Sequence, residues 1–133
     1  MGVLNYIRIF RVLRAMLREA QSYRTDDART GQLADSALAK AQSKRGALAA
    51  VFNQLSDLIR LVKAWATRRY RTIPWRSASL IIAGLLYFVS PLDALPDFIP
   101  GLGFLDDAFI ITWLMRAVRQ ELEKFRAWEA NAT

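Results

Sequence analysis

The sequence predicts an all-α fold, a small helical bundle formed by a single domain of 133 residues. Apolar residues recur at intervals of three and four, the spacing of one face of an α-helix. Three of the four prolines, which interrupt helices, lie between residues 91 and 100. We therefore expect a long amphipathic helical pair within residues 1–71. An apolar helical hairpin over residues 76–128, with an acidic Pro/Gly turn, should follow it.

Composition narrows the classes of function. The net charge is +7 and the pI is about 10.4, which suits an anionic partner such as a lipid surface, a nucleic acid or an acidic protein. The chain has no cysteine and no histidine, which excludes disulfides, Ser-His-Asp catalysis and the usual zinc sites. Among metal sites, only oxygen-ligand sites for ions such as Mg²⁺ or Ca²⁺ remain feasible.

Residues 3–23 are predicted to form a basic amphipathic helix. At 100° per residue one face is apolar and the opposite face carries Arg8, Arg11, Arg14 and Arg18. Such a helix can lie on an anionic membrane, with the arginine stems around its apolar face. It can equally pack on its own domain. The arginines leave no uninterrupted apolar run for a signal peptide, so we expect the chain to face the cytoplasm.

Residues 33–71 are predicted to form one long helix. Residues 24–32, which precede it, indicate a loop or a weak helix start. The apolar stripe of the long helix follows the three/four spacing closely from Leu48 to Ala66, and Gly46 is a point of weakness. The N-terminal helix is the expected antiparallel partner that covers this stripe.

Residues 60–76 are strongly basic and contain no acid. Trp65, Tyr70 and Trp75 are interleaved with the cations, directly before an apolar run, which is the pattern of a membrane interface. The same composition suits single-stranded nucleic acid, which we consider unlikely here, or a solvated basic face. The candidate membrane or anion contacts of this segment are Arg68, Arg69, Arg71, Trp75 and Arg76.

The segment from Ser77 to Leu92 is uncharged over 16 residues, with no polar face. A helix of this kind is either fully buried or in lipid, but a full membrane span needs about 20 residues. Three alternatives stay open: a re-entrant segment, a tilted transmembrane span, or a core helix. A last helix is expected over 104–128. Both outer ends of the hairpin are basic and its turn is acidic, so the positive-inside rule keeps both ends cytoplasmic.

A dense motif joins the two hairpin helices: Tyr87-x-x-Ser90-Pro91-x-Asp93-x-x-Pro96-Asp97-x-x-Pro100-x-x-Gly103-x-x-Asp106-Asp107. It resembles the signature of the YkvA-like family, a bacterial family of unknown function (number 1232), over about residues 76–115. The resemblance implies a small helical, membrane-associated protein and implies no particular activity.

Helix capping accounts for part of this motif. Ser90 can N-cap a short helix with Pro91 at its first position and Asp93 in its first turn. Regular helix is then interrupted by Pro96 and Pro100, and the glycines, Gly103 among them, permit positive φ in the turn.

The four aspartates of the motif allow a sharper alternative. They can cap helices and pair with distant arginines, or converge on a divalent cation, because four close carboxylates repel unless they are neutralised. This hypothetical metal site comprises Asp93, Asp97, Asp106 and Asp107. Catalysis is the weakest alternative, since no histidine or well-placed lysine could activate Ser90.

The sequence therefore favours a structural or interaction protein at the cytoplasmic face of the bacterial inner membrane. Its expected partners are membrane lipid and either a protein or a second copy of the chain. The alternative is a divalent-cation-binding module, or a metal-dependent enzyme, that uses the aspartates of the turn with Mg²⁺ or Ca²⁺. No reaction is identified, and an enzyme is the less favoured class.

Overall fold

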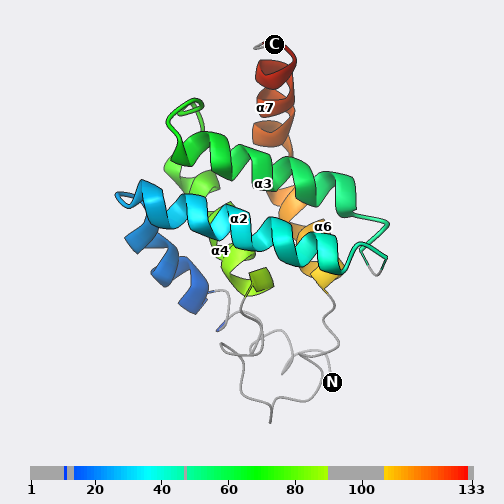
Figure 1. Ribbon diagram of the computed structural model, residues 1–133. Helices are drawn as coiled ribbons and strands as arrows, with labels where there is room; N and C mark the ends of the chain where they lie inside the picture. Colours follow the sequence, from blue (N-terminus) through cyan, green and yellow to red (C-terminus); the bar gives the residue numbers. More distant parts are fainter. Residues whose placement is uncertain (1–10, 12–13, 47, 90–106, 132–133) are drawn as a thin grey trace.

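The computed structural model describes residues 11, 14–46, 48–89 and 107–131, and within them it is all-α (Figure 1). Residues 14–20 are helical and run into a short 3-10 helix. The elements that follow are η1 (Gln21–Tyr23), α2 (Asp27–Ser43), α3 (Phe52–Ala66), α4 (Trp75–Val89), α6 (Asp107–Ala117) and α7 (Arg119–Asn131). The prediction of an all-α fold is confirmed.

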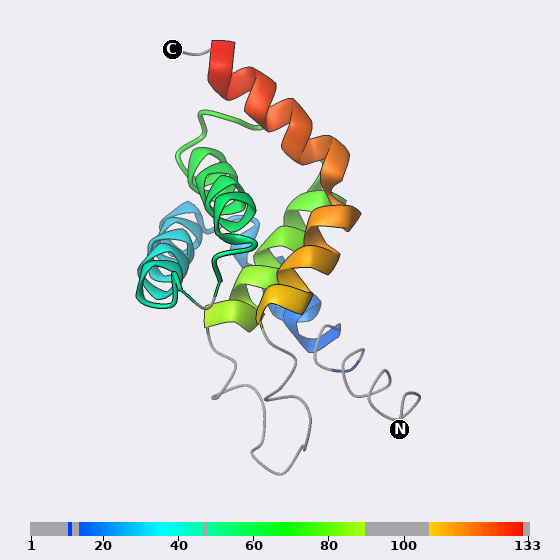
Figure 2. The same cartoon turned by 90° about the vertical axis from the view of Figure 1, so that its right-hand side faces the viewer.

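Helix α4 forms the centre of the bundle. Helices α2 and α3 lie side by side and antiparallel in front of it in Figure 1, and Figure 2 shows α6 running along its other side. Every residue from Ile81 to Phe88 is buried. Burial of each large apolar side chain contributes about 1.5–3 kcal/mol, so this helix supplies a large share of the core.

The described part of the most apolar helix is short. Helix α4 has 15 residues, which at the α-helical rise is about 22 Å, against about 30 Å for a hydrocarbon core. Within the described ranges, no helix combines the length and apolarity that a membrane crossing requires. Because α2, α3 and α6 all contact α4, the described residues fit the core-helix alternative for this segment.

The prediction of one helix over 33–71 is wrong, because two helices occupy this range. Helix α2 begins at Asp27, inside the segment expected to be a loop or a weak helix start, because the Asp26 carboxylate accepts a hydrogen bond from the Arg29 N–H (3.1 Å) and caps the helix. Helix α2 ends at Ser43 and α3 begins at Phe52. The antiparallel pair is thus α2 with α3, rather than the N-terminal helix with one long helix.

The described part of the N-terminal helix is amphipathic, as predicted. Met16 and Ala20 are buried, while Arg11, Arg14 and Arg18 are exposed. The adjoining η1 contacts α2, where the buried Thr30 hydroxyl donates to the carbonyl oxygen of Tyr23 (3.0 Å). Arg8 lies outside the described residues.

The hairpin of α4 and α6 forms near the expected bounds, but the single helix predicted over 104–128 is interrupted. Helices α6 and α7 meet at Val118, and we call this one-residue interruption the α6–α7 elbow. The backbone hydrogen bonds continue through it, since Val118 N–H donates to Leu114 (3.0 Å) and Leu122 N–H donates to Val118 (2.9 Å). Helix α7 thereby leaves α4 and reaches α3.

Candidate anion-binding surface

Two basic segments that are far apart in sequence meet beside the α3–α4 connection. The guanidinium of Arg24 lies 5.2 Å from the ring centroid of Trp75, and the Trp75 indole N–H donates to Gln21 (2.8 Å). The ring of Trp75 lies 5.8 Å from that of Trp65, over which Arg71 stacks at 4.1 Å. We call Arg24, Trp65, Arg71 and Trp75 the arginine–aromatic cluster. Its alternating cations and rings gain cation–π stabilisation, which is about 0.5–1 kcal/mol per exposed contact.

Asp27 ties this cluster to the first turn of α2. Its carboxylate accepts from Arg68 (2.7 Å) and from Arg71 (2.9 Å). Arg68 has φ of 62°, in the left-handed region that usually requires glycine after a helix. The following Arg69 N–H donates to Ala64 (2.9 Å), which closes the end of α3. The ion pair to Asp27 therefore accompanies a strained turn that reverses the chain toward α4.

A second group of aromatic rings packs α7 against the α3–α4 connection. The Tyr70 ring lies 5.2 Å from Phe125 and 5.1 Å from Trp128, and Arg69 lies 5.6 Å from the Trp128 ring. Tyr70 and Trp65 are each only 5% exposed, whereas Arg24, Arg68 and Arg69 are exposed. The rings therefore serve largely to pack the helices together. The groups exposed at the α3–α4 connection are guanidiniums.

The structure brings together part of the predicted contact set. Arg68, Arg69, Arg71 and Trp75 meet at the arginine–aromatic cluster or next to it, and the exposed Arg76 follows in the first turn of α4. The predicted motif is described only at its two ends: Tyr87 is buried near the end of α4, and Asp107 begins α6. Residues outside the described ranges are Ser90, Pro91, Pro96, Pro100 and Gly103.

The hypothesis of a cation site stays a prediction. Asp93, Asp97 and Asp106 lie outside the described residues, as does the side chain of Asp107. Elsewhere in the described ranges, no three acidic side chains gather in an arrangement suited to a metal ion.

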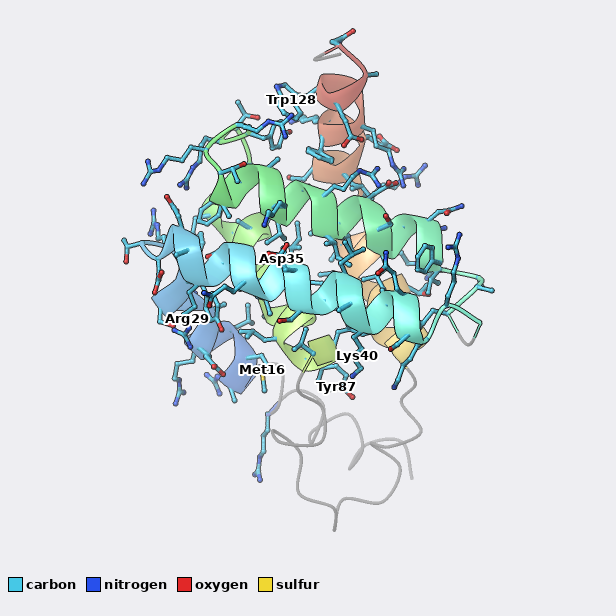
Figure 3. The ribbon with its side chains drawn as sticks, viewed as in Figure 1. Met16, Arg29, Asp35, Lys40, Tyr87 and Trp128 are labelled. Atoms are coloured by element: carbon cyan, nitrogen blue, oxygen red, sulfur yellow. The ribbon has the colours of Figure 1, made fainter. Side chains whose placement is uncertain are left out.

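Sequence reasoning missed Lys40. This residue belongs to α2, and its side chain reaches the end of α4 next to the motif. Its ammonium donates to the carbonyl oxygen of Phe88 and lies 5.0 Å from the Phe88 ring centroid. Figure 3 shows Lys40 and Tyr87 at the same end of the bundle. A cation is favourable there because the carbonyl end of a helix carries partial negative charge. Lys40 and Phe88 are 48 positions apart, and no local sequence pattern predicts their contact.

A carboxylate network links α3 to α7. Asp57 accepts hydrogen bonds from Arg60 and from Arg126, the latter at 2.7 Å, and Arg60 also donates to Glu129 (2.9 Å). The hydrogen bond to Glu129 is the main cause that raises the pKa of Arg60 above its ordinary value. On the other side of the molecule, burial raises the pKa of the Tyr23 hydroxyl.

Comparison with known proteins shows that the chain is similar to a family without an assigned activity. Residues 78–113, which span most of α4 and the start of α6, match the model of the family described as "Protein of unknown function (DUF1232)". The chain is also 30% identical over 89 residues to "Uncharacterized membrane protein YkvA" of Bacillus subtilis (strain 168). That alignment covers 67% of this chain and 84% of the relative. No solved structure matches the chain significantly.

Proposed function

The chain belongs to the DUF1232 family of proteins of unknown function, and we propose that it binds anionic lipid at the cytoplasmic face of the inner membrane as a structural or interaction component. One observation carries the proposal. Arg11, Arg14 and Arg18 project outward from one face of a helix whose opposite residues, Met16 and Ala20, are packed into the bundle. Because its apolar side is engaged by the protein, this helix would meet the membrane through guanidiniums.

Three further features support the proposal. The net charge of +7 attracts the chain to anionic surfaces, and exposed arginines near the α3–α4 connection extend the basic area. Guanidinium groups bind phosphate through paired hydrogen bonds. The Bacillus relative is named a membrane protein. Each Lys or Arg near an anionic membrane contributes about 1 kcal/mol, so three arginines on one helix face would contribute about 3 kcal/mol.

Vesicle sedimentation tests this proposal directly. The protein should sediment with phosphatidylcholine vesicles that contain phosphatidylglycerol, and much less with pure phosphatidylcholine. The double variant Arg14→Gln/Arg18→Gln should weaken binding about 30-fold, since about 2 kcal/mol is lost. The matched control Arg45→Gln/Lys124→Gln removes the same charge elsewhere. Equal binding to both vesicle types would refute the proposal, and equal losses in the two variants would refute the role of the N-terminal face.

Cell fractionation gives a second test. We expect a high-salt wash to release the membrane-bound chain, because screening weakens attraction between exposed charges and phosphates. Release by detergent alone would contradict attachment through the described arginines.

A further inference from the structure

A groove of about 380 Å³ lies between the first turn of α3 and the α6–α7 elbow. Its cationic wall consists of Arg116, Arg119 and Arg126, against one lining carboxylate, Glu123. Three positive groups and one negative group leave the lining two charges positive. The size falls in the range of small-molecule sites, about 300–1,000 Å³.

The arginines of the groove differ in how firmly they are held. Arg126 is oriented by Asp57, whose Oδ2 lies 2.6 Å from Nη2 of Arg126. Arg119 pairs with Glu123 at 3.2 Å, but both side chains are more than half exposed, so the pair contributes little and can exchange for another anion. Arg116 is exposed and forms no ion pair with any residue that the structure describes. Two of the three guanidiniums are therefore available to a ligand.

The open end of α3 adds to the positive potential of this wall. Val51 stands at the N-cap position and provides no side-chain cap, and the first turn contains no acid. Helix α2, in contrast, begins with Asp26 as its cap and Asp27 in its first turn. Val51 and Gln54 line the groove, so the positive end of the α3 dipole borders the same space as the arginines.

The rest of the groove combines polar and apolar side chains. Gln54 and Thr112 are polar, and Val51, Met115 and Leu122 are apolar. Val51 and Leu122 are almost fully buried, whereas Met115 is partly exposed. A simple inorganic anion would satisfy the arginines but leave the exposed part of Met115 in water. A ligand with an anionic head and an apolar portion would cover both.

We propose that this groove binds the phosphate headgroup and the adjoining acyl region of an anionic phospholipid. Arg116 and Arg119 would hold the phosphate through paired N–H donors, and Met115 would contact the first part of the acyl chain. The inference rests on the proposed membrane association, which it deepens by naming the lipid contact.

Short-chain phosphatidylglycerol, used below its micelle concentration, separates this site from general attraction to a bilayer. Calorimetric titration should show binding to the wild-type protein, and Arg116→Gln/Arg119→Gln should weaken it about tenfold or more, since each lost contact is charge-assisted. The double variant Arg14→Gln/Arg18→Gln loses the same charge and should keep its affinity for the short-chain lipid while losing vesicle binding. Met115→Gln, which retains every cation, should also weaken binding of the short-chain lipid.

The outcomes separate the two proposals. No binding of short-chain lipid by a protein that still sediments with anionic vesicles would overturn the groove assignment and leave the membrane proposal standing. Inorganic phosphate that binds as tightly as the lipid would overturn the assignment of a lipid to the groove. Binding of the lipid monomer without binding to vesicles would refute membrane association and leave the assignment of a lipid to the groove standing. Circular dichroism of each variant checks that the helical fold is retained.

Discussion

Replacement of Gly84 by alanine is expected to destabilise the protein, although the same change stabilises most helices. Gly84 lies in the middle of α4 and faces α6. A Cβ atom at this position would lie 2.6 Å from Cδ2 of Leu114, closer than such atoms approach in proteins, and 3.6 Å from its Cγ. Leu114 is 2% exposed, so its side chain has little room to move aside. Glycine therefore permits the close approach of the two hairpin helices.

The magnitude follows from two opposing effects. Alanine gains about 1 kcal/mol over glycine in a helix interior, while overpacking of a closed core costs about 1–3 kcal/mol. Gly84→Ala should therefore lower the free energy of unfolding by about 0–2 kcal/mol. Leu114→Ala alone should cost about 2–5 kcal/mol. In that background the added methyl meets no leucine, so Gly84→Ala should stabilise by about 1 kcal/mol, and the coupling energy should be about 1–3 kcal/mol.

Urea unfolding of the wild type, both single variants and the double variant measures this coupling. Gly31 provides the matched control, because it lies inside α2 and a Cβ there would meet only Ala66 and Lys63 at 3.9 Å, an ordinary contact. Gly31→Ala should stabilise by about 1 kcal/mol. If Gly84→Ala stabilised equally in the presence and absence of Leu114, the reasoning about a close α4–α6 contact would be refuted.

Two further changes test an ion pair and a hydrogen bond from a charged donor. Asp27→Asn removes the partner of Arg68 and Arg71, and should cost about 1 kcal/mol in urea unfolding because these side chains are partly solvated. It should also strengthen sedimentation with phosphatidylglycerol vesicles, since two guanidiniums are released; a loss of stability without this gain would contradict their availability to lipid. Lys40→Met should cost about 1–3 kcal/mol in the same unfolding assay, because the carbonyl of Phe88 loses a charged donor; an unchanged midpoint would contradict the contact.

The helix breaks show where sequence reasoning fails in this fold. Leu48, Val51, Leu55 and Leu58 keep the three/four spacing through the α2–α3 connection, and all four are buried. The periodicity is therefore the same whether the first two residues belong to a turn or to a helix. The α6–α7 elbow is hidden in the same way, because buried residues continue across it at helical intervals: Leu114, Val118, Leu122 and Phe125.

Other features could be recognised from local signals. The bounds of α4 follow from an uncharged run after a basic flank, and the outward face of the N-terminal arginines follows from their spacing. Asp26 and Asp27 carry a helix-start signal, and of the two alternatives for this segment the structure shows the helix start. The stacking of Arg24 on Trp75 could not be predicted, because the contact depends on how η1 packs against α4 and has no local signature.

The placement of acids separates the arginines that support the fold from those that are open to lipid. Arg60 is held by Asp57 and Glu129, whereas no acid in the described part of the chain pairs with Arg14 or Arg18. The arginines that form ion pairs lie over a core of buried apolar side chains. Exposed ion pairs add little to the stability of the folded protein. Added salt should therefore weaken vesicle binding steeply while it changes the urea midpoint little. Parallel losses of binding and stability would show instead that the ion pairs of the paired arginines contribute substantially to folding.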